Sequence, residues 1–335
     1  MSAPVEVATP AKPSGLSGMI SRHFHGGEDN SLGLLVMLAV LAILLSFASP
    51  YFLTATNLLN IGRGIAIIGI IAVGETIVMI SGGFDLSVGS TAAASGMAAG
   101  FLIAHGVPLP IGFAVGIAIG VVVGLINGAI ISYARINPLI ATLATLAVVR
   151  GLSYVISGGR EIIQSNEAFL QIGVGTVYGV PYIVIILAAT FLIFGWVMPR
   201  TLYGRYAYAI GSSARAAQRA GVPVARWRIA YYVTCSTLAA VAGLVFVART
   251  GNAQPSAAVG FELDVITAVI LGGTSLNGGR GRLFGTFIGL VLLGVVNNGL
   301  ILVGVQAFWQ QVVKGAILLI AVIYDELRRN RAEAE

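Results

Sequence analysis

Long apolar runs dominate this sequence and constrain its fold more than any other feature. Each run approaches the roughly 20 apolar residues that an α-helix needs to cross a bilayer. We count ten, at residues 33–49, 61–80, 88–105, 110–132, 139–157, 180–198, 229–248, 260–273, 284–303 and 307–324. The sequence therefore predicts an all-α fold, a polytopic transmembrane helical bundle of about ten spans.

Composition supports a lipid environment. Hydrophobic residues make up 57% of the 335 residues and charged residues only 10%, whereas a soluble domain carries about 25% charged residues. A water-soluble globule of this composition would have too little polar surface to cover itself. We therefore exclude a cytosolic enzyme and a nucleic-acid binder, and we expect the lipid bilayer to surround the chain.

Arginine placement predicts the orientation. The segment 199–228 carries six arginines, 274–283 carries two and the carboxyl-terminal stretch three. Basic residues concentrate in cytoplasmic loops. All three arginine-rich segments lie on the cytoplasmic side only if the run 260–273 crosses the membrane, although it has just 14 residues. We predict a disordered cytoplasmic tail at 1–32, a transmembrane domain at 33–325 and a cytoplasmic tail at 326–335.

One helix carries a regular glycine ridge. Gly112, Gly116, Gly120, Gly124 and Gly128 repeat every four residues, so they form a stripe about 24 Å long on one helix face. Another backbone can approach closely along such a stripe. The ridge indicates either static close packing or a surface on which helices slide.

Polar residues inside apolar runs are costly, so they usually face protein or water. As residues of a substrate pathway the sequence suggests Glu75, Asp85, Asn137, Asn297, Asn298 and Gln306. Structural alternatives stay open: Asp85 can cap a turn, and the amides can simply join helices. Arg63 and Arg150 can extend towards the membrane surface.

Catalytic motifs do not occur in the sequence. The only lysines, Lys12 and Lys314, do not stand in a phosphate-binding G-x-x-x-x-G-K-[ST] loop, and there is no zinc-protease HExxH motif or nucleophile elbow. We expect no enzyme activity and no cofactor bound by this chain. If ATP drives it, ATP and magnesium must bind to partner subunits.

The segment 199–228 also contains a short helix signal. Ser212 or Ser213 can cap a helix of about two turns, and Gly221 followed by Pro223 can end it. An element of this kind could dock into a groove on a soluble motor. The alternative is an ordinary basic loop. We assign ATPase coupling to Ser213, Arg215, Ala216, Ala217, Arg219, Gly221, Val222 and Pro223.

A weak internal echo links two segments. Residues 80–89 and 270–279 share five identical positions, and each follows an apolar run. Duplication is a common origin of transporter folds, but chance in an apolar chain of low complexity explains five matches nearly as well.

Several motifs taken in order resemble one family. They are residues 82–89, Arg150-Gly151-Leu152, residues 204–224, Ala253-Gln254-Pro255, residues 271–276 and Gly278-Gly279. Over about residues 50–325 the chain resembles the permease subunits of ribose/xylose/galactose-type bacterial ABC sugar importers, with a type II-like fold. Arg215 stands where the wider importer pattern Glu-Ala-Ala-x-x-x-Gly has Glu.

The resemblance implies a transport subunit of the bacterial inner membrane. It would pair with a second permease copy or a paralogue, with two cytoplasmic ATP-binding subunits, and with a periplasmic binding protein that delivers a monosaccharide or related polyol. We expect a small, mostly apolar passage with few amides. The rivals are an ion-coupled secondary transporter using Glu75 or Asp85, and a channel or scaffold subunit.

Overall fold

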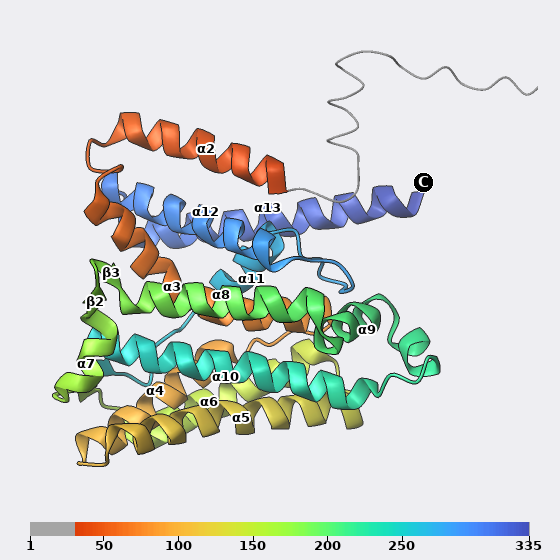
Figure 1. Cartoon of the computed structure of the whole chain (residues 1–335), viewed down its shortest axis with the longest axis horizontal. Helices are drawn as coiled ribbons and strands as arrows, with labels where there is room; N and C mark the ends of the chain where they lie inside the picture. Colours follow the sequence, from red (N-terminus) through yellow and green to blue (C-terminus); the bar gives the residue numbers. More distant parts are fainter. Residues whose placement is uncertain (1–30, 335) are drawn as a thin grey trace, which may run out of the picture.

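The computed structural model describes residues 31–334, and these form an elongated bundle of roughly parallel helices (Figure 1). Residues 1–30 of the predicted tail at 1–32 lie outside the described residues, and its last two residues begin the first helix at Ser31. The predicted boundary at 325 falls inside the last helix, which continues to Ala334. The helices are α2 Ser31–Ala48, α3 Ala55–Ile80, α4 Val88–Ala104, α5 Leu109–Tyr133, α6 Pro138–Ser157, α7 Glu167–Val174, α8 Tyr182–Arg200, α9 Leu202–Arg219, α10 Val224–Thr250, α11 Phe261–Leu271, α12 Leu283–Leu302 and α13 Ala307–Ala334.

Seven of these helices are long and apolar enough to cross a membrane: α3, α5, α6, α8, α10, α12 and the first 21 residues of α13. Each of the ten predicted runs coincides with a helix. The count of ten spans is nevertheless not confirmed, because α2 and α4 fall just short in length and α11 has only 11 residues. The structure therefore supports a polytopic helical membrane protein.

The connections gather at two ends of the bundle. At one end, the α7 end, lie α7 and two small antiparallel pairs: β1 (Ile162–Ile163) with β4 (Asn252–Ala253), and β2 (Thr176–Val177) with β3 (Val180–Pro181). At the other end, the α9 end, lie α9, the 272–282 loop and the end of α13 (Figure 1). The arginine-rich segments at 199–228 and 274–283 thus share one end, as the charge pattern predicts.

The glycine ridge of α5 is a close-packing surface. A Cβ added at Gly120 would lie 2.5 Å from the Ser236 carbonyl oxygen, and one at Gly124 2.5 Å from the Cα atom of Val233. Both contacts are on α10, which lies against α5 along much of its length. The predicted approach of another backbone is confirmed.

Helices α3 and α10 form the centre of the bundle. From Ile65 onwards nearly all of α3 is buried, including Ile70, Ile71 and Ile77. Close approach again depends on glycine, because a Cβ at Gly74 would lie 2.7 Å from the Cα atom of Cys235 on α10. Cys235 is fully buried, as expected for a small core residue.

Two short helices start inside the bundle. Helix α4 follows the loop 81–87, and α11 follows the irregular segment 251–260. Their first turns meet, because a Cβ at Gly89 of α4 would clash with both the Glu262 carboxylate and the Ala258 carbonyl oxygen. With 11 residues, α11 extends about 16 Å, roughly half of the hydrocarbon thickness. Broken helices of this kind often mark the solute sites of transporters.

Candidate functional site

Glu75 and Asp85 lie together at the start of α4, and both side chains are fully buried. The Glu75 Oε1 atom accepts a hydrogen bond from the backbone N–H of Asp85 at 3.2 Å, and the Cys235 thiol lies 3.6 Å from Oε2. Asp85 Oδ1 accepts from the backbone N–H of Ser87, the residue that precedes α4. A carboxylate here complements the positive amino-terminal end of that helix.

An amide extends this cluster to two more helices. Asn127 of α5 donates to the Ser87 hydroxyl at 2.9 Å and accepts from Thr145 of α6 at 2.7 Å. Ser236 of α10 donates to Asp85 Oδ2 at 3.2 Å. The donors around the two carboxylates are all neutral, and they come from three segments of the chain: the loop 81–87, α5 and α10. Since neither carboxylate is exposed, the arrangement holds helices together in this conformation; contact of Glu75 or Asp85 with solute stays a prediction.

Asn298 lies elsewhere and pairs with another amide. Its Nδ2 donates to Asn57 Oδ1 at 2.8 Å, and Asn57 Nδ2 donates back to Asn298 Oδ1 at 2.9 Å. This reciprocal pair joins α12 to α3 near the α7 end. Of the two alternatives for the amide, joining helices is the one that this geometry supports. The Oδ1 atom of the adjacent Asn297 is buried without a partner.

Two further predicted pathway residues lie at opposite ends. Asn137 is exposed at the α9 end, where it caps α6 by accepting from the Leu139 N–H at 2.9 Å. It lines an open groove of about 430 Å³ with Gly82 and Phe84. Gln306 is exposed at the α7 end, just before α13. The six pathway residues therefore do not form one site.

The predicted coupling helix is present. Helix α9 is broken at Ser213, whose φ of −164° and ψ of 100° are not helical. The Ser213 hydroxyl accepts from the Ala216 N–H at 3.2 Å, so it caps a second short segment. Gly221, with φ of +84°, and Val222 close that segment through bonds to the carbonyl oxygens of Gln218 and Ala217.

This short segment projects from the α9 end (Figure 1). Arg215, Ala216 and Arg219 are exposed, as is Pro223, whereas Ala217 is buried against the bundle. The segment therefore offers a basic and accessible surface. ATPase coupling through these residues stays a prediction.

Aromatic side chains attach the first part of α9 to α10. Tyr203 packs edge-on against Tyr231 with ring centroids 4.9 Å apart, and its hydroxyl donates to Thr234 at 2.9 Å. Trp227 packs against Tyr203 and Tyr206. This cluster was not predicted from the sequence, although four aromatic residues at 203, 206, 227 and 231 flank the arginines and could have indicated an anchored loop.

The first part of α9 also contacts two loops directly. A Cβ at Gly211 would clash with the Ile80 carbonyl oxygen, just before the loop 81–87, and with the Gly279 nitrogen. The two loops also contact each other, because a Cβ at Gly278 would lie 2.7 Å from the Cα atom of Gly82. Tyr208 donates to the Gly281 carbonyl oxygen at 2.8 Å. Burial raises the pKa of Tyr208 above its ordinary value, and nearby Arg282 lowers it in part. The donor is thus protonated at neutral pH, and α9 is fixed to the 272–282 loop.

A second polar group, not predicted from the sequence, lies around α11. Asp264 forms an ion pair with Lys314 of α13 at 2.8 Å. Arg150 of α6 donates to the carbonyl oxygens of Pro255 and Ala257 in the irregular segment, so it does not simply extend to the membrane surface. The available signal was a single lysine inside the apolar run 307–324.

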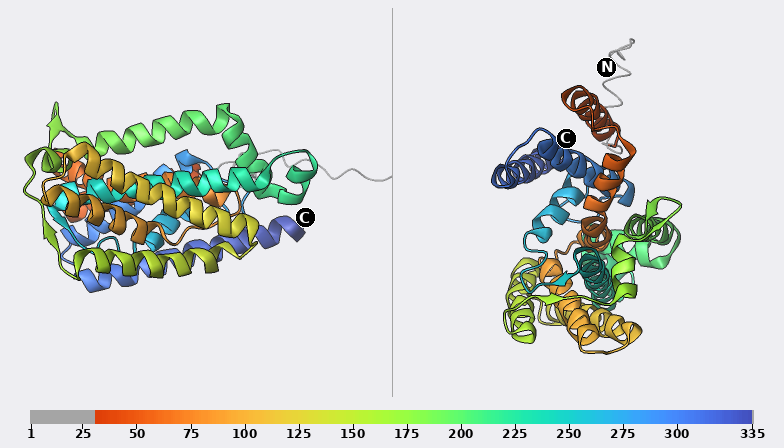
Figure 2. Two further views of the ribbon diagram at one scale, coloured as in Figure 1. Left: turned by 90° about the horizontal axis from the view of Figure 1, so that it is seen from below. Right: turned by 90° about the vertical axis from the view of Figure 1, so that its left-hand side faces the viewer.

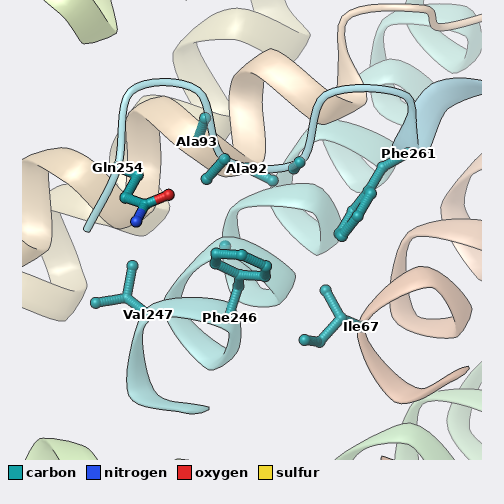
Figure 3. Close-up of a pocket in the computed structure, with 10 residues that line it drawn as sticks. Ile67, Ala92, Ala93, Phe246, Val247, Gln254 and Phe261 are labelled. Carbon is teal, nitrogen blue, oxygen red and sulfur yellow. The ribbon is translucent and has the colours of Figure 1, made fainter. Parts of the chain in front are cut away.

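The irregular segment also borders a small pocket. Figure 3 shows Gln254 pointing towards Ala92 and Ala93, with Phe246 and Phe261 completing an otherwise apolar lining. Its volume of about 10 Å³ suits one water molecule. This pocket is too small to hold a sugar.

The comparisons with known proteins identify the family. Residues 57–322 match the family described as the permease component of branched-chain amino acid transport systems. The chain belongs to this family. The ribose import permease of Bacillus subtilis is 44% identical over 305 residues, which is 90% of this chain and 94% of the relative. The L-arabinose transport system permease of Escherichia coli is 41% identical over 298 residues, 89% and 91% of the two chains.

Other comparisons agree. The ribose import permease of Escherichia coli is 39% identical over 299 residues, covering 88% of this permease and 93% of the relative. No solved structure gives a significant match. Membership of a permease family does not favour the ion-coupled alternative for Glu75 and Asp85.

Proposed function

We propose that this permease is the membrane-spanning subunit of an ATP-driven importer, forming the translocation pathway for a monosaccharide or related polyol. The observation that carries the proposal is the similarity, at 39–44% identity over about nine-tenths of the chain, to permeases named for ribose and arabinose. It binds no nucleotide itself; ATP and magnesium bind to separate cytoplasmic subunits. A periplasmic binding protein supplies the sugar, and a second permease copy completes the pathway.

The proposed topology has ten crossings in the bacterial inner membrane, with both termini in the cytoplasm. Helices α2, α4 and α11 complete the count, the last two with help from the irregular segments that precede them. The α9 end then faces the cytoplasm, which agrees with the arginines at 199–228 and 274–283 and the positive-inside rule. The α7 end faces the binding protein.

The coupling step uses the short segment after Ser213. ATP closes the nucleotide-binding subunits, these displace the segment, and the membrane cavity opens to the other side. Arg215 and Arg219 are exposed there, and the contacts of Gly211 with the 272–282 loop provide a direct backbone path into the bundle.

Reconstitution tests the proposal. Uptake of labelled D-ribose or L-arabinose into vesicles should require ATP, the ATP-binding subunit and the binding protein together. Charge reversal at Arg215 and Arg219 should weaken association with the ATP-binding subunit, whereas the same change at Arg160, near the α7 end, should leave it unchanged. Uptake driven by a proton or sodium gradient with this chain alone would contradict the proposal.

A further inference from the structure

One face of the bundle carries a charged pair at membrane depth. The Lys314 side chain is 33% exposed and its partner Asp264 18% exposed. Lys314 stands seven residues after the start of α13, roughly 10 Å along that helix from the α7 end. An ionisable pair at this depth is costly if it faces lipid, so such residues almost always face protein or water.

The same face exposes irregular backbone. Segment 251–260 runs from the end of α10 at the α7 end to the start of α11, and α11 ends near the α9 end, where Gly272 packs on Gly285. Residues 254–260 therefore lie within the hydrocarbon region. Ser256 is exposed and Val259 is 67% exposed. Lipid-exposed irregular backbone does not occur at this depth.

Three helices frame this segment. Seen along the bundle in Figure 2, α13 and α6 lie on the same side of the molecule, with α11 between them. Helix α13 contributes Lys314, α11 contributes Asp264, and α6 contributes Arg150 through its bonds to Pro255 and Ala257. Helix α8 lies on the other side, and its exposed residues, such as Leu192, are apolar. Helices α6 and α13 also expose apolar residues, such as Val148 and Val312. What distinguishes their side is the charged pair and the irregular segment between them, which need protein or water as neighbours.

We propose that Arg150, Asp264, Lys314 and residues 254–260 form a contact site for a neutral polyhydroxy solute, and that a second copy of this chain closes its open side. The inference rests on the proposed function and locates the pathway within it. A second copy related by two-fold symmetry presents the same polar surface, so both walls of the passage offer charges and carbonyl groups to water and solute.

The chemistry of this site suits weak, reversible binding of a sugar during transport. Lys314 has three N–H donors and the Asp264 carboxylate several acceptor sites, and their mutual bond uses only one of each. Adjacent hydroxyls of a polyol can exchange with water at these positions. Because the two charges cancel, the pair attracts neither anions nor cations strongly, and binding stays weak enough for release.

Cysteine labelling tests the location without relying on transport. In a Cys235→Ser background, Val259→Cys and Leu192→Cys are compared in membranes that contain the assembled importer. The two positions are similarly exposed, at 67% and 72%. We expect a water-soluble maleimide to label Val259→Cys and excess D-ribose to slow that labelling, whereas Leu192→Cys should react only with a lipid-soluble maleimide.

Cross-linking tests whether a second copy of the chain closes the open side of the site. A bismaleimide should give a dimer of the permease with Val259→Cys and none with Leu192→Cys. A Val259→Cys variant that reacts only with the lipid-soluble reagent, or that gives no dimer, would overturn the inference. A different result would contradict the proposed function: an importer assembled with the native sequence that takes up no sugar in the presence of ATP.

A charge-neutral pair of changes tests the solute contact. With the sugar-loaded binding protein in saturating amount, the double variant Lys314→Met with Asp264→Asn should lower the maximal rate of ATP-driven D-ribose uptake by about tenfold, because the hydroxyls lose their charged partners in the passage. If the variant remains assembled by the cross-linking assay and its maximal uptake rate is unchanged, the contact site is refuted.

Discussion

Gly124→Ala on α5 is a sharp test of the packing between α5 and α10. The added Cβ would lie 2.5 Å from the Cα atom of Val233 and 2.7 Å from the Tyr232 carbonyl oxygen, whereas ordinary contacts begin at 3.4 Å. Both neighbours are backbone atoms, which cannot rotate away. The two helices must separate by about 0.9 Å, the difference between 2.5 and 3.4 Å.

Two terms set the magnitude. Overpacking a tight core costs roughly 1–3 kcal/mol, and a gap of about 0.5–1 Å removes a quarter to a half of the dispersion energy at neighbouring contacts. Alanine recovers about 0.5–1 kcal/mol of helix propensity. We expect a net loss of about 2 kcal/mol in the free energy of unfolding. Gly195→Ala on α8 is the matched control, because nothing lies within 4 Å of its added Cβ.

Unfolding in mixed detergent micelles, followed by circular dichroism, measures both variants. Gly124→Ala should unfold at a lower denaturant fraction than the native chain, and Gly195→Ala at the same or a higher one. Equal behaviour would refute the packing argument. Uptake per folded molecule then separates the two alternatives for the ridge: a static contact leaves it unchanged, whereas a sliding surface loses uptake beyond the loss of folded protein.

Three other predictions follow from specific contacts. A double-mutant cycle with Asn57→Leu and Asn298→Leu should give a coupling energy of about 0.6–1.7 kcal/mol in the same unfolding assay, and a value near zero would exclude the amide pair as a joint between helices. Gly278→Ala should lower sugar uptake per ATP hydrolysed, since its Cβ would meet Gly82. Gly304→Ala is the control, because Gly304 has a similar φ of +80° but nothing lies within 4 Å of its added Cβ. Equal losses of uptake in the two variants would show that backbone strain alone causes the effect. Ser213→Ala should weaken binding of the ATP-binding subunit, because a lost cap costs roughly 0.5–2 kcal/mol, while Ser213→Thr should retain binding; unchanged affinity in a pull-down of Ser213→Ala would contradict the capping role.

The apolar runs were sufficient to predict where the helices lie, because a helix in lipid needs a long hydrophobic segment and the connecting segments of this chain are more polar. The ridge of α5 and the cap at Ser213 were also predictable, since both depend on residues close together in the chain. The starts of α4 and α11 were not predictable from the sequence. The irregular segments that precede these helices, 81–87 and 251–260, are stabilised by Asn127, Ser236 and Arg150 from distant helices.

The candidate site was less predictable for the same reason. Asn57 and Asn298 are 241 residues apart, so no local pattern indicates that each satisfies the other. Glu75 and Asp85 are conspicuous as charges, but their burial depends on how four segments converge. Lys314 and Asp264 were overlooked because each is one charge in an apolar run, and only the fold shows that they meet on an exposed face.

Residues 80–89 and 270–279, which share five identical positions, each follow a helix that ends in the same way. After α3, the Gly82 N–H bonds to the Met79 carbonyl and the Gly83 N–H to that of Val78; after α11, Gly273 bonds to Ile270 and Thr274 to Val269. These are the same C-terminal cap, with a left-handed glycine at 82 and 273. The sequence match aligns Gly82 with Gly272, one residue away from the structural equivalence. Two helices that end in one cap each select glycine at the left-handed position, but because the registers differ by one residue, this shared requirement does not account for the five identities. The end of α3 meets the loop that follows α11, since the Gly279 N–H donates to the Ile80 carbonyl oxygen at 2.8 Å, and the contacts of Gly211 with Ile80 and Gly279 place α9 against both. A displacement of α9 must therefore reach α3 and α11 together.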